Sequence, residues 1–119
     1  MEKGLEQKEL PIQFNYIDKA NELLLNWTKQ SRIVLINIQY IVPFVLSDKS
    51  ISVYFFYDKN KTMNDYQQNG TNELVKKKYL KILKILNYPS EYLNEITFEI
   101  DSDENVTENY EGSYFNRLR

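Results

Sequence analysis

Hydrophobic positions along the chain follow two different spacings, which predict helices in some stretches and strands in others. Over residues 14–29, apolar side chains recur every three or four positions, as in an amphipathic helix. A second stretch of helical spacing begins at Thr71, a suitable N-cap residue, and ends at about Asn87, because Pro89 disfavours helix before it. The apolar face of this second helix consists of Leu74, Val75, Tyr79, Ile82, Leu83 and Leu86.

Three stretches have the composition of strands. Residues 33–46 are rich in β-branched side chains, residues 51–57 carry aromatic side chains on both faces, and residues 96–100 alternate between apolar and polar. The polar turn at residues 47–50 predicts that the first two strands pair as an antiparallel hairpin. In the first strand, one face is expected to carry Val34, Ile36, Ile38, Tyr40 and Val42, and the other Leu35, Asn37, Gln39 and Ile41.

The order of these elements predicts a single α+β domain over residues 1–119, with residues 1–11 as a loosely ordered lead-in. Residues 58–70 are polar and are expected to form a loop or a strand-like excursion through Met63 and Tyr66. Ser102 or Asp103 can cap a short turn that runs to residue 109, and the aromatic side chains of residues 113–118 predict a last strand. We therefore expect an antiparallel sheet of about four strands, with two main helices packed on one face.

The composition of the chain excludes several kinds of chemistry. The 119 residues include no Cys and no His, so thiolate chemistry, Cys-based zinc sites and the commonest general base are absent. The formal net charge of −2 argues against a nucleic-acid-binding domain, which is usually basic. No apolar run is long enough for a signal peptide or a membrane span. We expect a cytoplasmic protein that is not an enzyme and that has no cofactor.

The acidic stretch near the C-terminus could in principle form a metal site or a catalytic pair of carboxylates. The spacing of Asp101, Asp103 and Asn105 matches the start of a calcium loop, but the sixth position is Val106 and the twelfth is Gly112, where the loop needs Gly and Glu. Glu99 and Asp101 share a strand face at about 7 Å, as in glycoside hydrolases. The chain lacks loops that would build a sugar cleft, so neither a metal site nor an active site is expected.

Charge is distributed unevenly along the chain. Residues 71–86 contain five Lys and one Glu, a net charge of +4, whereas residues 95–119 contain seven acids and two Arg, a net charge of −5. The lysines are explained by a solvated helix face, since no aromatic residue is interleaved with them for nucleic-acid binding. Acidic residues with tyrosines between them suit a surface that grips a basic partner. The residues expected to bind a partner are Asp101, Asp103, Glu104, Glu108, Tyr110, Glu111 and Tyr114.

Three segments together resemble small bacterial immunity (antitoxin) proteins. They are the strand SVYFFY at residues 52–57, the Lys/Leu-rich helix, and the closing stretch ITFEIDSDENVTENYEGSYF at residues 96–115. The resemblance lies in the style and order of the elements from about Asp18 onward. It implies a cytoplasmic protein that binds and neutralises a cognate toxin domain, such as a nuclease of a contact-dependent growth inhibition system. The expected partner is then a protein, and neither nucleic acid nor a membrane.

Two other functions fit the sequence. One is a regulatory or adaptor domain with the same protein-binding surface. The other is a nucleic-acid-binding domain that uses Lys76, Lys77, Lys81 and Lys84. The oligomeric state is left open by the sequence. For the immunity hypothesis, we expect that reversing the charges of Asp101, Asp103 and Glu104 weakens toxin binding without unfolding the domain.

Overall fold

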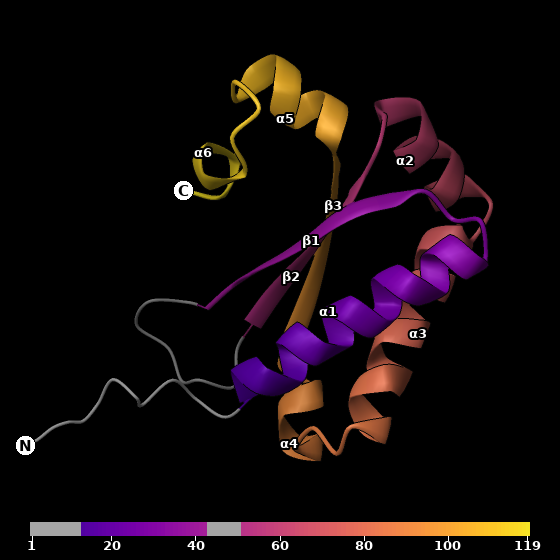
Figure 1. The fold of residues 1–119 in the computed structure, drawn as a ribbon, viewed down its shortest axis with the longest axis vertical. Helices are drawn as coiled ribbons and strands as arrows, with labels where there is room; N and C mark the ends of the chain where they lie inside the picture. The colour runs from indigo at the N-terminus through magenta and orange to yellow at the C-terminus, as the bar shows by residue number, and fades with distance from the viewer. Residues whose placement is uncertain (1–12, 43–50) are drawn as a thin grey trace, which may run out of the picture.

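Two long helices lie against one face of a three-stranded sheet in the computed structural model, which describes residues 13–42 and 51–119 (Figure 1). The expected lead-in at residues 1–11 and the expected turn at residues 47–50 lie outside the described residues. The strands are β1 (Leu35–Ile41), β2 (Ile51–Tyr57) and β3 (Ile96–Ser102). The helices are α1 (Gln13–Gln30), α2 (Asn60–Gln68), α3 (Thr71–Ile85), α4 (Ser90–Leu93), α5 (Asp103–Asn109) and α6 (Tyr114–Leu118).

The sheet is mixed, with β2 in the centre. β1 pairs with β2 in antiparallel orientation, as the hairpin prediction required, but β3 pairs with β2 in parallel. A parallel neighbour requires a crossover, and α2, α3 and α4 provide it between β2 and β3. The chain is an α+β domain, but the prediction of about four antiparallel strands is not confirmed. Residues 58–70, expected as a loop, contain α2, and the expected last strand is the short helix α6.

The hydrophobic core lies between the sheet and the two long helices. The β2 side chains Val53, Phe55 and Tyr57 are fully buried, and the ring of Phe55 lies 5.7 Å from that of Tyr79 on α3. Each large apolar side chain removed from water in this way contributes about 1.5–3 kcal/mol. The helices contribute the fully buried residues Ile17, Ala20 and Leu24 from α1, and Val75, Tyr79 and Leu83 from α3. The prediction that two main helices cover one face is therefore confirmed.

A bulge changes which side chains of the first strand face the core. The pairing of β1 with β2 shifts between Leu35 and Asn37, so that Leu35 lies opposite the core residue Tyr57. Leu35 is buried, whereas Ile36 is 48% exposed and Val34 is 42% exposed. The expectation that Val34 and Ile36 share the apolar face of Ile38, with Leu35 on the other face, is wrong at this end of the strand. An extra residue in one strand of a pair turns the following side chains to the other face.

Candidate functional site

The face of the sheet that points away from α1 and α3 is only partly covered by the described elements. We call it the open sheet face, and the register of the three strands assigns its members: Asn37, Gln39, Ile41, Ser52, Tyr54, Phe56, Thr97, Glu99 and Asp101. Thr97 and Glu99 are exposed, and the hydroxyls of Ser52 and Thr97 share a hydrogen bond of 2.9 Å. Phe56 and Asp101, at the other end of the face, are buried.

The short helix α6 covers that other end. The ring of its Tyr114 lies 4.7 Å from Phe56, edge to face, and Phe56 is fully buried as a result. The guanidinium of Arg117 lies over Tyr54 at 5.6 Å and over Tyr110 at 5.7 Å. Aromatic packing and cation–π contacts of this kind each contribute on the order of 0.5–1.5 kcal/mol. Helix α6 is thus anchored on the sheet by aromatic side chains of β2.

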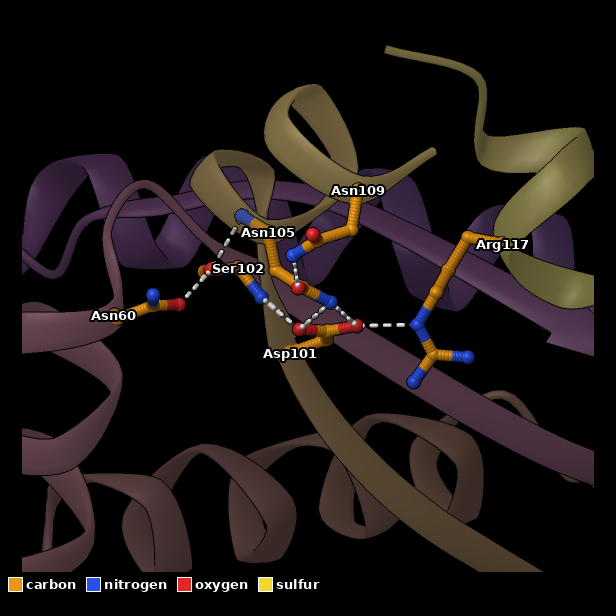
Figure 2. A network of polar contacts seen from close by, with 6 residues as sticks. All are labelled: Asn60, Asp101, Ser102, Asn105, Asn109 and Arg117. Atoms are coloured by element: carbon orange, nitrogen blue, oxygen red, sulfur yellow. Dashed lines mark hydrogen bonds and ion pairs between the residues drawn. The ribbon is translucent and has the colours of Figure 1, made fainter. Parts of the chain in front are cut away.

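A polar network fixes α5, α6 and α2 to the end of β3 (Figure 2). At its centre is Asp101, whose side chain is 8% exposed and accepts hydrogen bonds from the backbone of Ser102 at 2.8 Å and from Asn105 Nδ2 at 3.1 Å. Arg117 Nε donates to the second oxygen of Asp101 and forms an ion pair with it. Burial acts to lower the pKa of Arg117, but the hydrogen bond and charge of Asp101 outweigh it and raise that pKa.

Ser102 links this network to two helices at once. Its Oγ accepts a hydrogen bond of 2.9 Å from the backbone N–H of Asn105, which makes Ser102 the N-cap of α5. The same hydroxyl donates to Oδ1 of Asn60 at the start of α2. The sequence predicted this cap and a short turn to residue 109, and α5 confirms both.

Three of the five acids among the predicted partner-binding residues are engaged inside the domain. Besides Asp101, Asp103 accepts a hydrogen bond of 2.6 Å from the hydroxyl of Tyr114, and Glu104 Oε1 accepts one of 2.9 Å from the backbone of Asn60. Reversing these charges would break contacts that hold α2, α5 and α6 in place. The expectation that the triple reversal leaves the fold intact is therefore inconsistent with the geometry.

The other four predicted residues lie on α5, on α6 and in the turn between them. Glu108 and Glu111 are exposed, whereas Tyr110 and Tyr114 are half-buried. Glu111 and Gly112 adopt the left-handed backbone conformation, with φ of 56° and 75°, which turns the chain from α5 into α6. The structure thus divides the predicted set into an inner group that supports the fold and an outer pair of acids that faces solvent.

The structure adds residues that were not among those predicted to bind a partner. Glu99 is exposed on the open sheet face, and Phe115 of α6 is 74% exposed. An open groove of about 360 Å³ runs between β1 and α6, lined by Gln39, Tyr40, Ile41, Phe115, Leu118 and Arg119. Strand alternation indicated which face Glu99 occupies, but no signal in the sequence places residues 115–119 beside residues 39–41.

The geometry of the described residues supports neither a metal site nor a glycosidase-type pair of carboxylates. Among the residues that the structure describes, no three His, Cys, Asp or Glu side chains gather as they would around a metal ion. Segment Asp103–Asn109 is helical rather than a calcium loop. Glu99 and Asp101 share a face, but Asp101 is buried and already bound to three donor residues, whereas Glu99 is exposed.

Within residues 13–42 and 51–119, no helix is both long and apolar enough to cross a membrane. Neither a protein-family model, nor a curated protein, nor a solved structure matches this chain. The surfaces of the domain itself are therefore the guide to its function.

Proposed function

We propose that this domain is an immunity protein that binds a cognate bacterial toxin domain with a basic surface, such as a nuclease, and neutralises it. The observation that carries the proposal is the open sheet face, which presents half-buried Tyr54 and exposed Glu99, together with the groove between β1 and α6 that is edged by the exposed ring of Phe115. Exposed acids Glu108 and Glu111 lie on α5 and in the turn that leads to α6. These features suit binding better than catalysis.

The chemistry of this surface supports a basic protein partner. Aromatic side chains supply apolar area at the centre of an interface, and the groove between β1 and α6 offers room for a partner's side chain. The exposed acids Glu99, Glu108 and Glu111 attract a basic partner and raise the rate of association. A nuclease has such a basic surface at its substrate cleft, so a protein bound there excludes the nucleic acid.

An adaptor or regulatory domain would use the same surface, and the partner distinguishes the two functions. The decisive partner is a toxin domain encoded next to this protein. Isothermal titration with that purified domain, together with a growth-protection assay, tests the proposal.

Charge reversal at the solvent-facing acids sharpens this test. The variant Glu99→Lys/Glu108→Lys/Glu111→Lys changes only exposed side chains, so the domain should keep its circular dichroism spectrum and its unfolding midpoint. We expect toxin affinity to fall by at least about tenfold, with a loss of protection, because each reversal replaces attraction by repulsion.

A matched control carries the same change of net charge elsewhere. The variant Glu22→Lys/Asp65→Lys/Glu73→Lys reverses three acids on α1, α2 and α3; each is exposed and, within the described residues, pairs with a nearby lysine of its own helix. It should bind the toxin domain nearly as well as the wild type. Equal binding by both triple variants would rule out the open sheet face and α5 as the interface, and no binding of the wild type to the neighbouring toxin domain would rule out the immunity function.

A further inference from the structure

A second groove lies between the two long helices, away from the open sheet face. Helices α1 and α3 run antiparallel, since Tyr16 packs on Tyr88, Asn21 binds the hydroxyl of Tyr79, and Trp27 lies beside Lys78. The groove has a volume of about 370 Å³ and is lined by Leu23, Asn26, Trp27, Gln30, Lys78 and Ile82. The α1 residues among these follow helical spacing, so they form one continuous wall.

The walls of this groove combine apolar and basic side chains. Leu23, Trp27 and Ile82 provide apolar surface, and the ammonium group of Lys78 lies over the Trp27 ring at 5.5 Å. Lys81 is one helical turn further along α3 and is exposed. In the described part of the chain, neither Lys78 nor Lys81 forms an ion pair. The acids Glu73 and Glu22 pair with other lysines, Lys76 and Lys19.

Exposed apolar residues also lie along α3, outside the residues that line the groove. Leu74 is 51% exposed and Ile85 is 68% exposed, and both lie on the helical stripe that carries Lys78 and Lys81. This stripe carries both apolar and basic residues, so it is complementary to a ligand that carries both apolar and acidic side chains.

We propose that the groove between α1 and α3 binds an acidic segment of a partner protein that inserts a large apolar side chain against Trp27. The lysines bind the carboxylates of the segment, and the apolar wall takes its Leu or Phe. This site uses none of the residues of the open sheet face, so it does not depend on the proposed immunity function.

Two other occupants fit the groove less well. Single-stranded nucleic acid binds where several aromatic rings stack its bases, and Trp27 is the one aromatic side chain among the residues that line the groove. A second copy of this chain would offer its exposed Phe115, but the guanidinium of Arg119 lies over that ring at 5.6 Å.

The single tryptophan of the chain provides a direct readout, because Trp27 gives the only indole N–H signal in a ¹⁵N correlation spectrum. The probe is a synthetic peptide of about twelve residues in which Glu and Asp flank a central Leu-Phe pair. We expect a saturable shift of the indole signal. The variant Lys78→Gln/Lys81→Gln should weaken peptide binding at least about fivefold, because it removes two charge pairs.

The controls distinguish charge from position and peptide from the other occupants. Lys59→Gln/Lys61→Gln removes two exposed lysines at the start of α2 and should leave the affinity unchanged. A peptide with Lys in place of Glu and Asp should not bind. The proposal is overturned if millimolar peptide causes no shift, if oligothymidine of equal length binds more tightly, if dilution of the protein alone shifts the signal, or if the α2 and α3 variants weaken binding equally.

Discussion

The helical layer and the C-terminal region of this domain are stabilised by different forces. On the helical side, α1 and α3 bury a continuous apolar surface against β2, centred on the fully buried Phe55. On the other side, α5 and α6 are attached through a few directional contacts around Asp101 and through the packing of Tyr114 on Phe56. Apolar burial adds up over many contacts, whereas a polar network depends on each partner being present.

The two regions also use their charges differently. The lysines of α3 lie mostly in solvent, as expected for an amphipathic helix, and Lys76 forms only a surface pair with Glu73. In the C-terminal region, Asp101, Asp103 and Glu104 point into the domain and bind its own donors. A count of acidic residues therefore overestimates the acidic surface that a partner can reach.

The largest effect should come from the core of the helical layer. Phe55→Ala removes a fully buried ring that packs on Tyr79 and Phe98, and should lower the free energy of unfolding by about 3–5 kcal/mol. Urea denaturation followed by circular dichroism measures it. Phe115→Ala is the matched control, since this ring is 74% exposed and its removal should change stability by less than about 0.5 kcal/mol. Equal losses in the two variants would contradict the assignment of the core.

A smaller loss should follow when the polar network is broken. Arg117→Ala leaves the buried carboxylate of Asp101 without its cation, and should cost about 2 kcal/mol, below the value for a fully buried pair because Arg117 is 25% exposed. Arg119→Ala removes an exposed arginine and should have little effect. If the two variants have the same unfolding midpoint in urea, the Asp101–Arg117 pair does not anchor α6.

The smallest effects should come from two tyrosine hydroxyls, one in each region. Tyr114→Phe removes the hydrogen bond to Asp103 and should cost about 1 kcal/mol. The hydroxyl of Tyr88 is buried without a hydrogen-bond partner in the described part of the chain, so Tyr88→Phe should be neutral or stabilising at neutral pH. Thermal unfolding of the two variants side by side measures the difference, and a larger loss for Tyr88→Phe would reverse the expected order.

The same two tyrosines predict how the stability of the domain changes at alkaline pH. Burial raises the pKa of Tyr88 to about 12, and burial together with the hydrogen bond to Asp103 raises that of Tyr114 to about 12. The unfolded chain releases these protons near pH 10, while the folded domain still holds them. The contribution of these groups is therefore complete below about pH 10 and is lost as the pH rises towards 12. Each Phe variant should make the decline less steep, which urea unfolding across this pH range would reveal.

Local pattern in the sequence was sufficient to predict much of the fold. The helical spacing of residues 14–29 and 71–86 identified α1 and α3 within one or two residues at each end. Aromatic content identified β2 and alternation identified β3, and of the two predicted caps, Ser102 and Asp103, Ser102 is the one that caps α5. Helix α2 was missed because residues 60–68 are mostly polar: Met63 and Tyr66, one helical turn apart and partly buried against the core, are too few to give a clear periodic signal.

The C-terminal residues 113–118 were expected to form a strand because of their aromatic content, but they form α6. Ser113 caps this helix by accepting a hydrogen bond of 3.1 Å from the backbone N–H of Asn116. Tyr114 then packs on Phe56, a contact between residues far apart in the chain. Aromatic content favours a strand only where a neighbouring strand is available, and here the sheet offers its face rather than its edge.

What the sequence determined by itself was local: the two amphipathic helices, the strands, and the acidic and tyrosine-rich character of the C-terminal region. Tertiary structure alone decided that β3 runs parallel to β2, that three of the predicted interface acids bind the domain's own donors, and that Trp27 meets Lys78 between two helices. The physical reason is the distance along the sequence over which each kind of interaction acts. Periodicity and capping depend on neighbours within a few residues, whereas a surface is composed of residues that only the fold brings together.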